Sequence, residues 1–342
     1  MSFLAVLLAL LFEQVRPLAH ENHAHGLARL WASGVVRNLD AGRHLHAVLV
    51  WSVAVLLPSL GVWLVYLGLL YLHVLLAFVW VVVVLYFSLG FRQFSHHFTQ
   101  VREALEAGDE AAARKALAKW KLLRLEDLPG SELVRHTVEH SVLSAHRHVF
   151  GVLGWFCVLA ALGLGPAGAV FYRLSEYVGR HWSRNNPVPG APSLVLTPAS
   201  AAVRQFAQSL WHAVDYLPAR FTAMGLAVVG SFEDAIDCWR NYTQRLEDGG
   251  RAENDAVILA ATAGAMGVRL GGEALKSAFD ASASQSFMAG EQTNPLGQGP
   301  TAEPRTTPGP EPQNQHLGSV VGLIWRCVVL WMLQLALLTL AR

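Results

Sequence analysis

The sequence predicts an all-α, polytopic helical membrane protein with about five transmembrane helices and a soluble helical hairpin. Two observations carry this prediction. Only 15% of the 342 residues are charged and 53% are hydrophobic, whereas a soluble domain usually carries about 25% charged residues. The apolar residues are also concentrated, because the 45 residues from Ala47 to Phe91 contain no Asp, Glu, Lys or Arg. One helical span needs about 20 residues, so this run is long enough for two.

Residues 1–91 are expected to form the N-terminal membrane helices. The stretch from Ser2 to Phe12 is apolar but lacks the basic residues that open a signal peptide, so it is expected to remain as a first helix. Two spans follow at about 46–67 and 69–91. Pro58, Gly61 and Gly68 are candidates for a kink or a loop between them.

Residues 92–148 change in character, with nine Lys or Arg and eight Asp or Glu residues. Helical spacing of Ala and Leu predicts a water-exposed helical hairpin whose turn is supplied by Gly108 and Asp109. One face of the hairpin is expected to hold five apolar residues: Val101, Leu105, Ala112, Ala116 and Trp120.

Residues 149–278 are expected to form a membrane and cavity region. Its charge-free run, Val149 to Tyr172, contains GLGPAG at 163–168. Two interpretations stay open, a single straight span or a re-entrant pair of half-helices, which is tolerated where protein or water covers the backbone. A polar cavity is expected to form from 135–150, 172–180, 212–222 and 250–273.

The remaining segments are a linker and a last span. Residues 279–318 are rich in Ser, Gln, Pro, Gly and Thr and are expected to be a disordered linker. Residues 319–342 are expected to form a C-terminal transmembrane helix. The formal net charge is only +1, which does not indicate a nucleic-acid partner, and three scattered cysteines indicate neither a disulfide framework nor a CxxC metal site.

The sharpest local motif is HxxEH, from His136 through Glu139 to His140. Residues four apart share a helix face, so the two imidazoles could bind Zn²⁺ while Glu139 acts as a general base, as in inverted zincins. Against this zinc-hydrolase interpretation, the chain contains 15 His residues and the third ligand has no motif. We therefore assign no metal here, and Glu139 stays a candidate catalytic residue because ionisable groups near a membrane surface are often functional.

Two further strings carry candidate binding residues. In DYLPARFT, Asp215 and Arg220 flank Pro218, which is expected to start a helix. Arg220 suits either a bidentate contact to a phosphate or carboxylate, or an ion pair with Asp215. The string AGAMGVRLGG at 263–272 has small residues suited to close packing, and it fits no phosphate-binding loop motif.

Together these strings resemble the membrane superfamily of the CobD/CbiB adenosylcobinamide-phosphate synthases and the AmpE-type regulatory proteins. VREALEAGDEAAARKAL, GPAGAVFYRL, DYLPARFTA and AGAMGVRLGG occur in the order of the family. Several polar positions depart from the synthase pattern, since His140 and Leu143 replace its Asn and Asp and Leu259 replaces a Glu. The N-terminal acidic motif of the synthases is also absent.

The resemblance implies a bacterial inner-membrane protein of several passes in contact with the lipid bilayer. It also implies ATP-dependent formation of an amide between a corrinoid carboxylate and an aminopropanol-type amine, with ATP and Mg²⁺ if that activity is retained. Glu139 would be the base or amine anchor, and the substrate would bind five residues: Arg173, Glu176, Asp215, Arg220 and Asn254. The alternative is a non-enzymatic AmpE-like sensor or regulator of cell-wall or β-lactamase signalling. The oligomeric state is not specified by the sequence.

Overall fold

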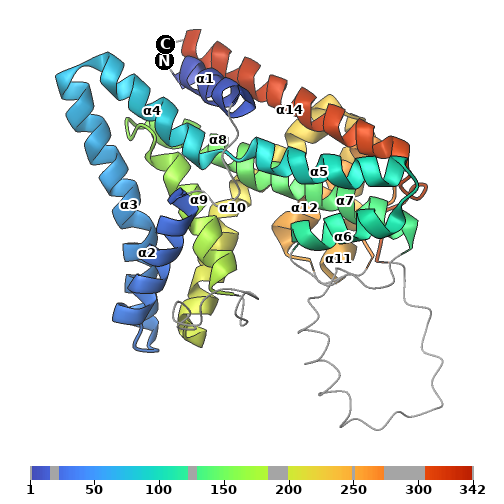
Figure 1. Ribbon diagram of the computed structural model, residues 1–342, viewed down its shortest axis with the longest axis horizontal. Helices are drawn as coiled ribbons and strands as arrows, with labels where there is room; N and C mark the ends of the chain where they lie inside the picture. The colour runs from blue at the N-terminus through green and yellow to red at the C-terminus, as the bar shows by residue number, and fades with distance from the viewer. Residues whose placement is uncertain are drawn as a thin grey trace. The chain divides into compact units, whose positions relative to one another are not determined.

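The computed structural model describes residues 2–15, 23–121, 129–183, 199–248, 251–272 and 305–340, and these are almost entirely helical (Figure 1). In this described part, β pairing is limited to an isolated bridge between Gly271 and Thr306. The predicted all-α class is therefore confirmed. The helices are α1 (Ser2–Val15), α2 (His23–Leu39), α3 (His44–Leu72), α4 (Val74–Ser88), α5 (Phe91–Glu106), α6 (Glu110–Lys121), α7 (Gly130–Ala145), the π-helix η1 (His146–Phe150), α8 (Gly151–Ala161), α9 (Ala167–His181), α10 (Ala201–Val229), α11 (Phe232–Asp248), α12 (Glu253–Met266) and α14 (Asn314–Leu340).

The chain divides into two compact units. Unit 1 comprises Met1–Phe94, Ser144–Thr222 and Val328–Arg342, and unit 2 comprises Ser95–Leu143 and Ala223–Cys327. The chain thus enters unit 2 near the start of the predicted hairpin and leaves it five residues before the predicted end at 148. Each unit is described by itself below.

Three of the described helices are long and apolar enough to cross a membrane: α3, the continuous helix Gly130–Ala161 and α14. The apolar helices α1 and α4 are shorter, with 14 and 15 residues. The predicted spans at 46–67 and 69–91 are shifted, because α3 continues through Gly61 and Gly68 to Leu72. The break falls at His73, whose extended backbone ends α3 and whose Nδ1 accepts the backbone N–H of Leu75.

The run from Val149 to Tyr172 is not one straight helix. Helix α8 ends at Ala161, and α9 begins at Ala167 after a turn in which Gly163 and Gly165 have positive φ. Helices α8 and α9 pack closely, since a Cβ at Gly168 would lie 2.1 Å from the Trp155 carbonyl oxygen. A single straight helix over this run is therefore wrong. Because α8 is the end of the continuous helix Gly130–Ala161, the hairpin is formed by this long helix and α9 and not by two half-helices.

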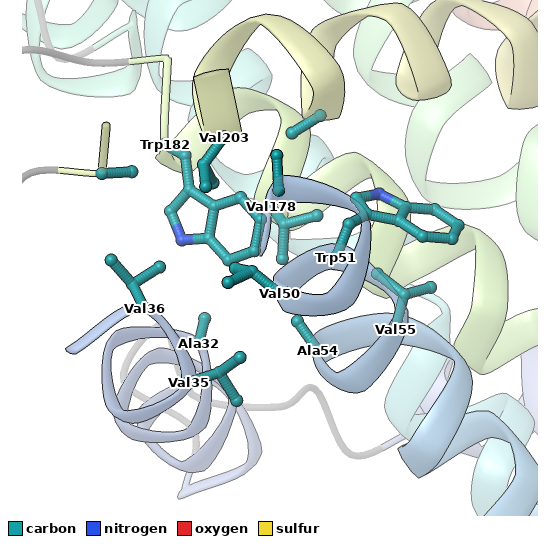
Figure 2. Close-up of a cluster of buried hydrophobic side chains, with 13 residues drawn as sticks. Ala32, Val35, Val36, Val50, Trp51, Ala54, Val55, Val178, Trp182 and Val203 are labelled. Carbon is teal, nitrogen blue, oxygen red and sulfur yellow. The ribbon is translucent and has the colours of Figure 1, made fainter. Parts of the chain in front are cut away.

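The apolar core of unit 1 lies where α2, α3, α9 and α10 meet (Figure 2). Trp51 and Trp182 are the largest side chains of this core, with exposed fractions of 6% and 5%. Trp51 also packs edge-on against Phe171, at 6.3 Å between ring centroids. Apolar burial stabilises such a core by about 25 cal/mol for each Å² of apolar surface that is removed from water.

Two prolines lie inside helices of unit 1, Pro58 in α3 and Pro218 in α10. The prediction that Pro218 starts a helix is therefore wrong, because α10 runs continuously from Ala201 to Val229. A proline inside a helix leaves the carbonyl four residues earlier without its backbone donor. In α10 this carbonyl belongs to Val214, and it accepts the indole N–H of Trp155 at 3.0 Å.

In unit 2, the predicted turn between α5 and α6 is confirmed. Gly108 has a φ of 75°, and Asp109 Oδ1 accepts the backbone N–H of Ala112 at 2.8 Å, which caps the start of α6. The buried face of α6 is shifted by one residue from the prediction, because Ala113 and Leu117 are fully buried whereas Ala112 is exposed.

The rest of unit 2 is built on α11 and α12, which pack side by side. A Cβ at Gly264 would lie 2.1 Å from the Asp234 carbonyl oxygen, so glycine is required for this approach. The predicted linker, 279–318, lies outside the described residues up to 304. From Arg305 onward it is ordered, because Thr307 N–H donates to the Leu270 carbonyl at 2.8 Å and α14 begins at Asn314.

Candidate functional site

Glu139 lies at the centre of a buried ion-pair cluster in unit 2. Its Oε1 accepts hydrogen bonds from Arg135 Nη1 at 3.1 Å and from the backbone N–H of Gly271 at 2.9 Å. Its Oε2 accepts one from Arg251 Nη2 at 2.8 Å. The residue is only 4% exposed. A buried carboxylate needs such partners, because an unpaired charge is costly to remove from water.

This cluster fixes the glycine-rich segment that follows α12. Arg251 Nη1 also donates to the Gly272 carbonyl at 2.6 Å, so one arginine binds both the carboxylate and the segment. Gly271 and Gly272 have φ values of 105° and 80°, which favour glycine. Leu270, one residue earlier, exchanges hydrogen bonds with the Thr307 side chain. The string LGG thus connects α7, the residues just before α12 and residues 305–309 through hydrogen bonds.

The N-terminal side of the cluster adds a second carboxylate and an imidazole. Glu132 pairs with Arg135, which lies one helical turn before Glu139 on α7. His136 Nε2 lies 3.1 Å from Arg135 Nη2 and its Nδ1 lies 3.5 Å from Glu139 Oε2. The two carboxylates and two arginines balance in formal charge. The arrangement is suited to holding backbone in place more than to binding an additional anion.

The HxxEH motif does not bring its residues to one point as a zinc site would. His140 packs edge-on against Trp120 at 4.5 Å between ring centroids, whereas His136 and Glu139 face the arginines. Within the described residues there is no group of three or more His, Cys, Asp or Glu placed to hold a metal ion. Two guanidinium groups beside Glu139 also disfavour a cation there.

Asn254 lies in the first turn of α12, three residues after Arg251, and is 3% exposed. It therefore belongs to unit 2 with Glu139, His136 and His140. The other predicted site residues, Arg173, Glu176, Asp215 and Arg220, lie in unit 1. The predicted site residues thus fall into two groups by unit.

Asp215 is the acceptor of a fully buried polar network in unit 1. Its Oδ1 accepts the Tyr172 hydroxyl at 2.7 Å and lies 2.9 Å from His146 Nε2. His146 Nδ1 lies 2.8 Å from the Thr222 hydroxyl. The four side chains are between 0% and 1% exposed. Both ring nitrogens of His146 are engaged, which fixes the orientation of the imidazole.

The network changes the acidity of its members. Burial raises the pKa of Asp215, but His146 and the Tyr172 hydroxyl outweigh it, so that the pKa lies below its ordinary value. Burial and the neighbouring Asp215 carboxylate raise the pKa of Tyr172 well above its ordinary value. Asp215 is thus held as a carboxylate and Tyr172 as a hydroxyl donor.

Arg220 lies apart from this network on the same helix. Its guanidinium carbon sits 3.4 Å above the ring centroid of Tyr216, and its Nη1 donates to the Tyr216 carbonyl at 3.2 Å. Tyr216 is 44% exposed. The structure therefore places Arg220 over an exposed aromatic ring, and the partners of Asp215 are His146 and Tyr172 in place of the predicted ion pair.

Arg173 and Glu176 form a second charged group on α9, together with Arg180. Glu176 Oε2 accepts from Arg173 Nη1 at 3.2 Å, and its Oε1 accepts from Arg180 Nη1 at 2.8 Å. The Glu176 side chain is 8% exposed, whereas those of Arg173 and Arg180 are 16% and 38% exposed. Burial raises the pKa of Glu176, but the two arginines outweigh it and lower the pKa to about 2.

Sequence reasoning missed the partners that organise both groups. Arg251 is 112 residues from Glu139, and His146 is 69 residues from Asp215. His146 begins the π-helix η1, a feature that often marks functional sites, but no local pattern in the sequence indicates it. Trp155 was also missed, because a proline that starts a helix, as expected of Pro218, needs no substitute donor.

Long apolar helices and buried charged networks define a helical membrane protein with polar groups inside its helical units. The chain matches the family described as "CobD/Cbib protein" over residues 2–182. It belongs to this CobD/Cbib family.

Two relatives carry the name "Cobalamin biosynthesis protein CobD". The protein from Stutzerimonas stutzeri (strain A1501) is 28% identical over 324 residues, which cover 92% of this chain and 86% of the relative. The protein from Chromobacterium violaceum (strain ATCC 12472) is 31% identical over 251 residues, which cover 73% of this chain and 67% of the relative. No solved structure matches the chain.

Proposed function

We propose that this protein acts in cobalamin biosynthesis by joining a corrinoid carboxylate to an aminopropanol-type amine in an ATP-dependent reaction. The proposal places it in the bacterial inner membrane with several passes. Its family and the names of its two relatives support the pathway. The observation that carries the chemical step is the group of Arg173, Glu176 and Arg180 on α9.

This group is suited to an anionic ligand. Two guanidinium groups share one carboxylate, which leaves a formal charge of +1, and the arginine side chains are more exposed than Glu176. Arginine binds carboxylate and phosphate oxygens in bidentate geometry. Glu176 holds both arginines in place on α9, and Arg173 is the residue proposed to meet a corrinoid carboxylate or a phosphate of ATP.

Mg²⁺ would enter this reaction with ATP. It usually keeps several waters and binds through one or two carboxylates together with the phosphates, so it needs no complete protein cage. Glu176 and Asp215 are the predicted site carboxylates of unit 1, and each already accepts a hydrogen bond from another side chain. The residues described therefore fit ATP phosphates through the arginines better than they fit a preformed metal site.

In this proposal Glu139 serves to hold protein segments in place. Three donors already bind its two oxygens, so the carboxylate fixes the Gly271–Gly272 turn and the start of α12, where Asn254 lies. The role of Glu139 as a catalytic base, and the binding roles of Asp215, Arg220 and Asn254, stay predictions. The observed contacts favour a positioning role for Asp215.

Complementation of a cobalamin auxotroph that lacks the synthase tests the proposal. We expect the wild-type chain to restore growth and Arg173→Gln to fail while reaching the membrane at the same level. Arg102→Gln is the matched control, because Arg102 also pairs with a glutamate on its own helix but does so on the exposed surface. Absence of growth with correctly inserted wild-type protein would overturn the proposed enzymatic activity and favour a regulator of the AmpE type.

A further inference from the structure

Helix α10 contains a built-in defect at Pro218, which lacks the backbone N–H that would reach the Val214 carbonyl. The indole N–H of Trp155, from α8, donates to this carbonyl at 3.0 Å. An unsatisfied buried carbonyl is costly, so the tryptophan supplies a bond that the helix itself cannot make. We call the set of Trp155, Val214 and Pro218 the α10 clamp.

The same solution occurs independently in α3. Pro58 leaves the Ala54 carbonyl without its helical donor, and the indole N–H of Trp31, from α2, donates to that carbonyl at 3.2 Å. In both cases a tryptophan from a neighbouring helix binds the carbonyl four residues before a proline. The repetition indicates that the indole N–H replaces the missing backbone donor.

A third tryptophan provides an internal comparison. Trp80 Nε1 donates to the Val62 carbonyl at 3.2 Å. The residue four positions after Val62 is Tyr66, which has a backbone N–H and lies inside α3. The Val62 carbonyl therefore also has a backbone donor within the helix. The Trp80 bond is an additional bond, whereas the Trp155 bond replaces a missing backbone bond.

The α10 clamp lies directly beside the buried network of unit 1. Val214 precedes Asp215, whose carboxylate binds Tyr172 and His146. The Trp155 ring packs edge-on against Phe171 at 5.0 Å between ring centroids, and Phe171 precedes Tyr172 on α9. One side chain thus contacts both α9 and α10 next to the residues that the network joins.

We propose that Trp155 is a positioning residue, which holds the backbone of α10 before Pro218 in place so that Asp215 meets His146 and Tyr172. The Trp155 N–H fixes the Val214 carbonyl, and the direction of the next residue follows from it. Loss of the N–H frees the carbonyl to rotate toward water, and α10 opens at Pro218. The functional part of this inference rests on the proposed function, whereas the clamp itself does not.

Hydrogen exchange of the full-length protein in detergent tests the clamp without any substrate. Trp155→Phe keeps an aromatic ring against Phe171 and removes the N–H donor. We expect it to raise the opening equilibrium of the α10 amides between 214 and 222 by about 5- to 100-fold, the range for one buried hydrogen bond. Trp80→Phe is the matched control, and we expect it to leave exchange of these amides unchanged.

A second substitution separates the donor from the bulk of the indole. Pro218→Ala restores a backbone N–H that can reach the Val214 carbonyl. We expect the double variant Trp155→Phe, Pro218→Ala to return to near wild-type exchange. Unchanged exchange in Trp155→Phe, or an absence of recovery in the double variant, overturns the clamp. If Trp155→Phe cannot be purified folded, recovery of folding in the double variant supports the inference and its failure overturns it.

The effect on Asp215 has its own readout. The side-chain nuclear magnetic resonance signal of His146, identified by its loss in His146→Gln, should shift in Trp155→Phe and return in the double variant. A signal that stays at its wild-type position in Trp155→Phe while α10 exchange increases overturns the positioning role. If the wild-type protein forms no amide, these two measurements still decide the inference, so its failure is distinct from that of the proposed function.

Discussion

Glu139 and Glu176 are both buried carboxylates that lie between two arginines, yet their surroundings differ. Glu139 has a third donor in the Gly271 backbone, and its arginines Arg135 and Arg251 are 8% and 7% exposed. Arg180 beside Glu176 is 38% exposed. The first carboxylate is closed within unit 2, whereas the second lies beside arginines that are 16% and 38% exposed.

Removal of the charge at Glu139 should destabilise unit 2 strongly. Glu139→Gln leaves two buried guanidinium groups without their shared carboxylate, and we expect a loss of about 3–5 kcal/mol in the free energy of unfolding. Denaturant unfolding in detergent measures it. Glu106→Gln is the control, because the side chains of Glu106 and its partner Arg102 are 58% and 36% exposed and an exposed pair contributes about 0–1 kcal/mol. Equal losses in the two variants would contradict the role of Glu139 as the buried centre.

Glu176 should make the protein sensitive to acid. Its pKa falls from an ordinary 4.5 to about 2 in the folded state, so the folded state binds the proton more weakly than the unfolded state. The stabilisation is complete above pH 4.5 and is lost as pH falls toward 2, on the order of 3 kcal/mol. Glu176→Gln should flatten this part of the pH profile of unfolding. A profile identical to that of the wild type would contradict the assignment.

At the scale of elements, the sequence indicates where helices exist better than where they bend. The α5–α6 turn follows from Gly108 and Asp109, because both residue types favour turns. The turn between α8 and α9 was only one of two alternatives, since an apolar run with central glycines fits a straight span as well. The local sequence predicts a helix start at Pro218, because the residue that replaces its missing N–H, Trp155, lies 59 residues from the Val214 carbonyl that it binds.

Close packing of α8 on α9 should depend on glycine. Gly168→Ala places a Cβ 2.1 Å from the Trp155 carbonyl oxygen, so the two helices must separate. We expect a loss of about 1–3 kcal/mol, the usual cost of overpacking, and a lower melting temperature in detergent. Gly154→Ala is the control on α8, because its Cβ would have ordinary contacts of 3.8 Å or more. A control that is destabilised as much as Gly168→Ala would contradict the packing account.

At the scale of the whole molecule, local pattern could identify candidate residues but not their grouping. Glu139 and Asn254 belong to unit 2, and Arg173, Glu176, Asp215 and Arg220 belong to unit 1. The chain leaves unit 2 after Leu143 and returns to it at Ala223, and such long-range pairing has no local signature. The family and the helical membrane class were predictable because they depend on composition and on ordered motifs.

The most direct test of the account is amide formation by the purified protein. The membrane-extracted wild-type chain would be incubated with a corrinoid carboxylate, an aminopropanol-type amine, ATP and Mg²⁺, and the corrinoid would be followed by mass spectrometry. The account predicts a corrinoid whose mass equals acid plus amine minus water, formed only with ATP and lost in Arg173→Gln but not in Arg102→Gln. A folded wild-type protein that binds no corrinoid and forms no such product would contradict it.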